Sequence, residues 1–141
     1  MNKKYVYPFI LFFSLFVNIA LAEKPMAPDK VSGAELVTAE QVIELVQSMP
    51  NLVIIDARRE EEFKRGHIDG AHSILDVEMT QEDLNALLTE KDQPIVFYCN
   101  GPRCVRSSNA STKAVSWGYK KIYWFRGGWK EWTDKGYPVS Y

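Results

Sequence analysis

The 141-residue sequence contains little cysteine and little histidine, and its charges nearly balance. Two cysteines and two histidines, with no histidine at a ligand spacing from the cysteines, do not make a zinc motif, so we expect no metal. With 17 basic and 18 acidic residues, the chain lacks the positive excess that nucleic-acid binding needs. No internal repeat is visible. A content of 46% hydrophobic and 25% charged residues argues against disorder and fits one globular domain.

The first 22 residues have the pattern of a secretory signal peptide. Lys3 and Lys4 precede an apolar run from Tyr5 to Ile19, and Ala20–Ala22 supplies the small residues that signal peptidase reads. We expect cleavage after Ala22, and hence a secreted protein, or a periplasmic one in a two-membrane bacterium, without further membrane contact. The alternative is an uncleaved anchor, because the apolar run approaches the length of a spanning helix.

The remaining chain divides into a short leader and one domain. Residues 23–33 are rich in proline, glycine and charge, and we expect them to form a flexible leader. Residues 34–141 alternate short apolar runs with amphipathic stretches. The runs 52–55 and 95–98 predict strands that are buried on both faces of a sheet. This alternation indicates an α/β fold with a parallel sheet and helices on both faces.

Capping and turn residues predict where the other elements lie. The expected helices follow Thr38 and Thr80, whose capping partners are Gln41 and Asp83, and cover 60–65, 107–117 and a terminal stretch through Trp129 and Trp132. Further short strands are expected at 72–75 and 122–125. Ligands bind such sheets beyond the carboxyl ends of the strands, and both Asp56 and Cys99 fall there.

Cys99 is the candidate nucleophile. It joins a buried strand to a helix, where backbone N–H groups and the helix dipole favour anions. Arg103 and Arg106 add positive charge, and all these effects favour a thiolate. Asn100, Gly101 and the two arginines are therefore the expected binding residues for an anionic substrate. The alternative is that Cys99 is a small buried hydrophobic residue.

Four ordered segments of the chain resemble the rhodanese homology domain. They are Ile55–Arg58 with Glu62-Phe63, Gly66–Ala71, the Cys99 loop, and Arg126–Trp129 with Gly136–Val139. The resemblance extends from about Leu36 to Val139. It implies a five-stranded parallel sheet flanked by helices and a persulfide that forms on Cys99.

The loop departs from the pattern of this family. Single-domain members resemble Cys-x-x-Gly-x-Arg-Ser, whereas Arg106-Ser107 comes two positions later here, and the longer loop contains a second cysteine, Cys104. Related phosphatases and arsenate reductases also have an enlarged loop, which makes oxyanion chemistry an alternative. However, the Cys-x5-Arg spacing that they resemble is not met either.

The role of Cys104 has three alternatives. It could resolve a persulfide or sulfenate on Cys99 through a reversible disulfide. It could instead lock the loop in a permanent disulfide, or simply pack as a bystander. Export would place both cysteines in a compartment that oxidises thiols.

Other polar residues have both functional and structural interpretations. Asp56 either pairs with an arginine or handles a proton at the pocket rim. Arg58 and Glu62 have helical spacing and are expected to form an ion pair. His67 is expected to be a hydrogen-bonded structural residue. The aromatic residues near the end of the chain are expected to pack in the core: Tyr123, Trp124, Phe125, Trp129 and Trp132.

The sequence therefore predicts an exported sulfurtransferase. Cys99 would take a sulfane sulfur from thiosulfate or a similar small anion and pass it to a thiol or another nucleophile, without a cofactor. One alternative is a thiol–disulfide protein that cycles Cys99 and Cys104, and another is a binding module with this fold and no turnover. Nothing in the composition requires more than a monomer.

Overall fold

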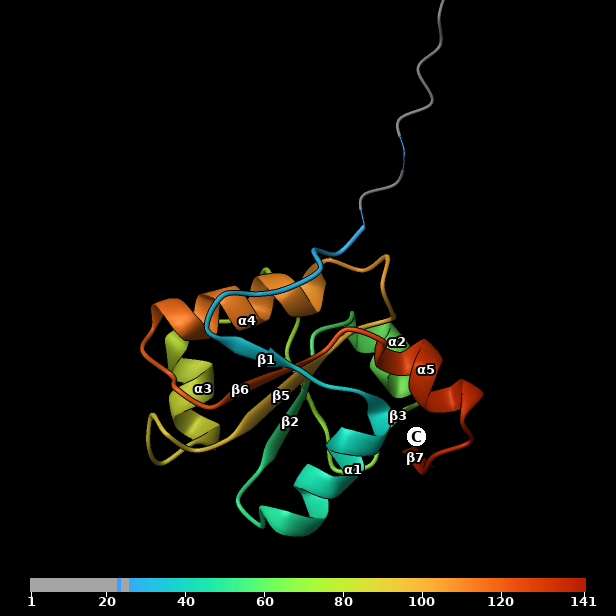
Figure 1. Ribbon diagram of the computed structural model, residues 1–141, viewed down its shortest axis with the longest axis horizontal. Coiled ribbons are helices and arrows are strands. Elements are labelled where there is room, and N and C mark those ends of the chain that lie inside the picture. Colours follow the sequence, from blue (N-terminus) through green and yellow to red (C-terminus); the bar gives the residue numbers. More distant parts are fainter. Residues whose placement is uncertain (1–22, 24–25) are drawn as a thin grey trace, which may run out of the picture.

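The computed structural model describes residue 23 and residues 26–141. The expected signal peptide, residues 1–22, lies outside the described residues. Within them, a five-stranded parallel sheet in the order β1-β6-β5-β2-β4 confirms the expected α/β architecture (Figure 1). Its strands are β1 (Ala34–Leu36), β2 (Val53–Asp56), β4 (His72–Ser73), β5 (Ile95–Tyr98) and β6 (Ile122–Phe125).

The central strands β2 and β5 are buried on both faces, as their unbroken apolar sequences predict. They run parallel, with Val53 opposite Ile95 and Asp56 opposite Tyr98. Because alternate side chains point to opposite faces of a sheet, these strands contribute to two separate hydrophobic clusters. The parallel pairing also brings Cys99, directly after β5, to the edge of the sheet where β2 ends.

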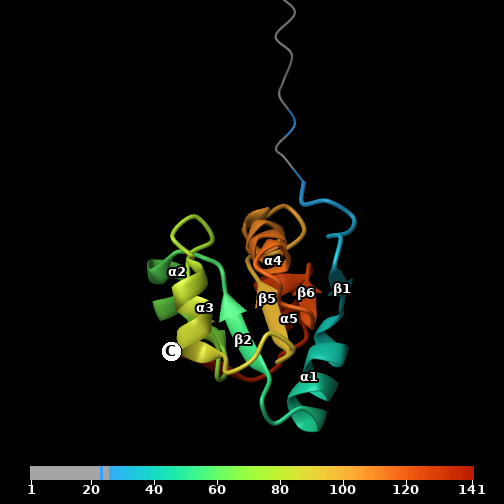
Figure 2. The same ribbon diagram turned by 90° about the vertical axis from the view of Figure 1, so that its left-hand side faces the viewer.

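Helices cover both faces of this sheet (Figures 1 and 2). They are α1 (Ala39–Ser48), α2 (Glu60–Lys64), α3 (Gln81–Leu87), α4 (Arg106–Ser116) and α5 (Gly128–Asp134). Leu84 of α3 and Ala110 of α4 belong to one hydrophobic cluster, whereas Val42 of α1 and Trp132 of α5 belong to the other. None of the helices in the described part of the chain is long and apolar enough to cross a membrane.

The expected caps define the helix ends. Thr38 accepts a hydrogen bond from the Gln41 backbone N–H (3.3 Å), and the Gln41 side chain accepts one in return (2.9 Å). Thr80 and Asp83 form the same capping box at the start of α3. Gly118, with φ of 86°, follows α4 in the left-handed conformation that glycine favours. These local predictions are confirmed.

The segment 26–33 is packed against the domain, which differs from the flexible leader expected from its composition. Ala27 is buried in a cluster with Trp124. Its backbone N–H donates to the carbonyl oxygen of Pro102 in the Cys99 loop (2.9 Å). Arg126 donates to the carbonyl oxygen of Ala27 (2.9 Å). Composition alone could not show this, because every partner lies far along the chain.

Three short strands were not anticipated from the sequence. β1 forms an edge of the main sheet beside β6. β3 (His67–Ile68) and β7 (Val139–Ser140) pair antiparallel in a separate two-stranded sheet. Strands of two or three residues are too short to show the alternation that identifies a strand.

Candidate active site

The Cys99 sulfur lies at the start of α4, inside the loop that connects β5 to this helix. The backbone N–H of Ser107 in the first turn of α4 points to the sulfur (3.4 Å), and the Ser107 hydroxyl lies 3.1 Å from it. The Ser107 oxygen also accepts a hydrogen bond from the indole N–H of Trp124 (2.9 Å). Because this bond uses the oxygen of the Ser107 hydroxyl as an acceptor, the hydroxyl proton is free to point at the Cys99 sulfur. The start of a helix and these two groups can stabilise negative charge on Cys99.

The loop also closes over this sulfur. The Cys99 thiol donates to the carbonyl oxygen of Cys104 (3.2 Å), and Cys99 is only 1% exposed. Cys104 is half-buried, and its backbone N–H donates to Gly101 in a tight turn (2.9 Å). Both cysteines are free thiols. In this state of the loop, the carbonyl oxygen favours the protonated form of Cys99.

The two cysteines therefore differ in ionisation. A hydrogen bond with Cys104, together with burial, raises the pKa of Cys99, although Ser107 acts in the opposite direction. The neighbouring Cys99 side chain lowers the pKa of Cys104 to about 6, opposed by burial and aided by the backbone of Asn100 and by the backbone and charge of Arg106. In this closed loop the pKa of Cys99 is raised and that of Cys104 is lowered, which is the opposite of the effect that the sequence predicts for Cys99. The sequence places positive charge near both sulfurs and does not show which one is buried.

Glu62 of α2 binds the Cys99 loop through two of the predicted binding residues, Asn100 and Arg106. Its carboxylate accepts hydrogen bonds from the Asn100 side chain (2.7 Å) and from Arg106 (3.4 Å). Burial alone would raise the pKa of Glu62, but the hydrogen bonds from Asn100 and from the Arg59 backbone outweigh it and lower the pKa. Sequence reasoning assigned Glu62 only to an ion pair. Its place in the Glu62-Phe63 segment of the family resemblance was the available signal.

The other two predicted binding residues lie differently. Arg103 is exposed on the outside of the loop, so the structure does not bring it together with Asn100 and Arg106. Gly101 is buried, and its carbonyl oxygen accepts the hydrogen bond that closes the turn to Cys104. Of the two arginines, Arg106 is therefore held beside the sulfurs, while Arg103 is free to meet a ligand that arrives from solvent.

The start of α5 supports the loop from behind. The backbone N–H groups of Trp129 and Lys130 donate to the carbonyl oxygens of Cys99 (2.8 Å) and Asn100 (2.9 Å). Gly128 approaches so closely that a Cβ there would overlap the Cys99 carbonyl oxygen, and its φ of 58° also favours glycine. The Arg-Gly-Gly-Trp segment therefore positions the backbone of Cys99.

Asp56 belongs to a buried ion pair and not to the surroundings of the sulfurs. Arg58 donates to both carboxylate oxygens of Asp56 (2.6 and 2.9 Å), and Tyr98 donates its hydroxyl proton to the same group (2.6 Å). This confirms that Asp56 pairs with an arginine. The expected Arg58–Glu62 ion pair is wrong, because Arg58 turns into the core, where its guanidinium group lies over the Trp129 ring at 4.6 Å.

The remaining candidates are structural. His67 stacks on Phe63 with ring centroids 3.7 Å apart, and its Nδ1 donates to the Phe63 carbonyl oxygen (3.0 Å). Trp124 is fully buried and Trp132 nearly so, which confirms that these aromatic side chains pack in the core.

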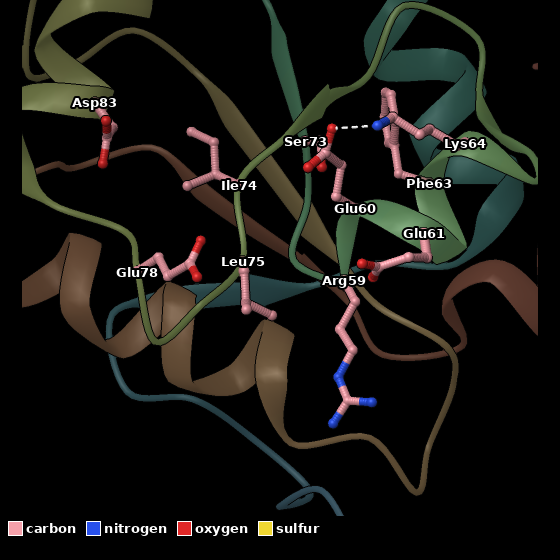
Figure 3. A pocket seen from close by; sticks show the side chains of 10 residues that line it. All are labelled: Arg59, Glu60, Glu61, Phe63, Lys64, Ser73, Ile74, Leu75, Glu78 and Asp83. Atoms are coloured by element: carbon pink, nitrogen blue, oxygen red, sulfur yellow. Dashed lines mark ion pairs between the residues drawn. The ribbon is translucent and has the colours of Figure 1, made fainter.

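Two hollows flank α2. One of about 200 Å³ touches the Cys99 loop at Asn100, and its lining also includes Arg58, Glu62, Arg65, Gly66 and Trp129. The other, of about 710 Å³, lies between α2, the chain after β4 and α3 (Figure 3). Neither cysteine lines it, and its charges have both signs, including the Glu60–Lys64 ion pair drawn in Figure 3. The smaller hollow is thus the one that adjoins the loop.

Comparison with known proteins identifies the family of this chain. The profile of the rhodanese-like domain matches residues 38–135. The uncharacterised protein YibN of Escherichia coli (strain K12) is 26% identical over 109 residues, which span 77% of this chain and 73% of YibN. Thiosulfate sulfurtransferase 18 of Arabidopsis thaliana is 28% identical over 120 residues, spanning 72% and 86% of the two chains. A solved human single-domain sulfurtransferase is 27% identical and has a TM-score of 0.59 over 72% of this chain and 97% of its own. The chain therefore belongs to the rhodanese-like domain family.

Proposed function

We propose that this protein is a sulfurtransferase that carries a sulfane sulfur on Cys99. The observation that carries the proposal is the position of the Cys99 sulfur at the start of α4, where the backbone N–H and the hydroxyl of Ser107 both face it. Membership of a family that includes sulfurtransferases supports it. Arg103 and Arg106 suit a small anionic donor such as thiosulfate, and the acceptor would be a thiol or another nucleophile.

The chemistry needs no cofactor. Cys99 loses its proton and its thiolate attacks the outer sulfur of thiosulfate. The sulfur–sulfur bond of the donor breaks, sulfite leaves with the electron pair, and a persulfide remains on Cys99. Ser107 and the start of α4 stabilise the thiolate before attack and the persulfide anion after it.

The closed loop must open for this reaction. Cys99 is 1% exposed, and its proton is held by the Cys104 carbonyl oxygen, so a donor reaches the sulfur only when the turn from Gly101 to Cys104 moves. Such movement removes the carbonyl oxygen from the sulfur while the Ser107 groups stay on α4. Opening therefore exposes Cys99 and favours its ionisation at the same time.

Mass spectrometry after thiosulfate treatment tests the proposal. Trypsin cleaves after Arg103, so the two cysteines fall in different peptides, and we expect the added sulfur on the Cys99 peptide of the Cys104→Ser variant. Cys99→Ser should take up no sulfur, and Ser116→Ala, at the far end of α4, is the matched control that should react like the parent protein. Uptake of sulfur by Cys99→Ser at the parent rate would overturn the proposal.

A second candidate is a thiol–disulfide protein that cycles between the two thiols and the Cys99–Cys104 disulfide. The contact of the Cys99 sulfur with Cys104, and the low pKa of Cys104, favour it. It predicts a defined reduction potential and reduction of a partner disulfide without any sulfur donor. A redox titration against glutathione, together with trapping of free thiols in freshly extracted protein, separates it from the sulfurtransferase.

We further propose that the protein acts after export, as a monomer, in the periplasm or outside the cell. The support is the signal-peptide pattern that ends at Ala22. The intact mass of protein from the exported fraction should correspond to a chain that begins at Glu23. A mass that includes residues 1–22 would indicate the uncleaved anchor instead.

A further inference from the structure

The Cys99 loop holds a second thiol next to the sulfur that would carry the persulfide. The Cys99 sulfur lies 3.2 Å from the backbone oxygen of Cys104, and each of the two side chains shifts the pKa of the other. The turn from Gly101 to Cys104 folds the second cysteine back over the first. No other cysteine occurs in the chain.

We infer that Cys104 discharges the persulfide on Cys99, so that the protein releases its sulfane sulfur as hydrosulfide and ends as a Cys99–Cys104 disulfide. The inference rests on the proposed function, because it needs the persulfide to form on Cys99. It makes Cys104 a second catalytic residue, with hydrosulfide as the sulfur product and a dithiol as the co-substrate.

The electrons balance within the loop. The Cys104 thiolate attacks the inner sulfur of the persulfide, which is the Cys99 Sγ atom, and a bond forms between the two cysteine sulfurs. The persulfide bond breaks, and the outer sulfur leaves with the electron pair and takes one proton as hydrosulfide. The sulfane sulfur is reduced by two electrons, and the two cysteines are oxidised to a disulfide. An external dithiol then reduces this disulfide and restores both thiols.

Geometry and charge favour this intramolecular step over attack by an outside thiol. The inner sulfur of the persulfide is buried, whereas Cys104 already lies in the same loop, so its effective concentration is high. Attack also needs a thiolate. The Cys99 thiol lowers the pKa of Cys104 most, and although the persulfide lacks that thiol proton, the backbone of Asn100 and the backbone and charge of Arg106 lower this pKa as well. Arg106, whose charge helps to lower that pKa, is anchored by Glu62 beside the loop.

A single-turnover experiment tests the inference. Reduced protein, freed of reductant without air, is mixed with excess thiosulfate, and sulfide, sulfite, free thiols and intact mass are measured. We expect the parent protein to release one sulfite and one sulfide per chain, to lose both free thiols, and to lose two hydrogens in mass. Addition of a dithiol should make sulfide release continuous.

Cys104→Ser separates this step from the formation of the persulfide. It should still release one sulfite and keep the extra sulfur on the Cys99 peptide, with no sulfide until dithiol is added. Val105→Ala, a change at the neighbouring position that leaves both thiols in place, should behave like the parent protein.

Two outcomes overturn this inference and leave the proposed function intact. In the first, the parent protein keeps the persulfide on Cys99 and releases no sulfide. In the second, the extra sulfur moves onto the Cys104 peptide without disulfide formation. If Cys104→Ser releases no sulfite and gains no sulfur, the proposed function itself fails.

Discussion

At the scale of single residues, the site depends on which polar groups share a buried environment. Asp56 and Arg58 are almost fully buried, and their opposite charges pair with each other. The Tyr98 hydroxyl donates a hydrogen bond to the same carboxylate of Asp56. The spacing of Arg58 and Glu62 predicted another pair. Arg58 instead pairs with Asp56, at the end of a buried strand, because an unpaired charge in the core is costly.

Asp56→Ala should destabilise the protein by about 3 to 5 kcal/mol, because it leaves the Arg58 charge buried without a partner. Glu60→Ala, which breaks the exposed pair with Lys64, is the control and should leave the free energy of unfolding close to that of the parent protein, because solvent screens exposed ion pairs. Urea unfolding measures both. Similar losses of unfolding free energy in the two variants would show that the buried pair stabilises the protein no more than the exposed pair does.

Alkylation of Cys104 by iodoacetamide should rise with pH to a plateau, with its midpoint near pH 6. Because the pKa is lowered, the reactive thiolate is present above the midpoint and is lost as the pH falls through it. Unfolded protein should instead show a midpoint near 8.5, as free cysteine does.

Cys99→Ala removes the hydrogen bond that lowers the pKa of Cys104 most, so the midpoint should move upward. Labelling is read on the peptide that begins at Cys104, which trypsin separates from Cys99. A midpoint at or above pH 8 in the parent protein would contradict the lowered pKa of Cys104.

At the scale of elements, the start of α5 holds the loop that follows β5. Two of its backbone N–H groups bind the carbonyl oxygens of Cys99 and Asn100, and Gly128 permits the close approach. These elements are neighbours only because β5 and β6 pair in the sheet. The family resemblance identified the glycine pair, but its contact with Cys99 is a property of the folded chain.

Gly128→Ala should displace the loop backbone and reduce the rate of sulfur uptake by at least about tenfold, while destabilising the protein by about 2 to 4 kcal/mol. Gly136→Ala is the matched control. Its φ of 68° is similar, but a Cβ there has open space around it, so it should cost only about 1 to 2 kcal/mol.

Thiosulfate-dependent sulfite release and urea unfolding are measured on both glycine variants. Equal effects would mean that backbone conformation alone, without the approach to Cys99, explains the need for glycine at position 128.

At the scale of the whole molecule, the segment 26–33 ties the start of the described domain to the Cys99 loop. Ala27 binds the backbone of Pro102, and Val31 is buried with Ala27 and Trp124. Trp124 in turn donates to Ser107 beside the Cys99 sulfur. The segment therefore reaches the site through two connected contacts.

Val31→Asp should place an unpaired carboxylate against Trp124 and lower the free energy of unfolding by about 1 to 3 kcal/mol. Because release of the segment also frees Pro102, Cys99 should become more reactive to iodoacetamide. Lys30→Asp, at an exposed neighbouring position, is the control, because it changes the net charge by even more than Val31→Asp does but buries no carboxylate. Unchanged stability and labelling would mean that the segment has no effect on the loop.

The sequence by itself determined the parallel sheet, the helix caps, the family and the position of Cys99 at a strand end. These follow from local apolar runs, capping pairs and short motifs, which act between neighbouring residues. Only the tertiary structure decided that the closed loop raises the pKa of Cys99 and lowers that of Cys104, that Arg58 pairs with Asp56, and that the segment 26–33 packs on the domain. Burial and charge pairing depend on which distant elements meet, and no local pattern in the chain contains that information.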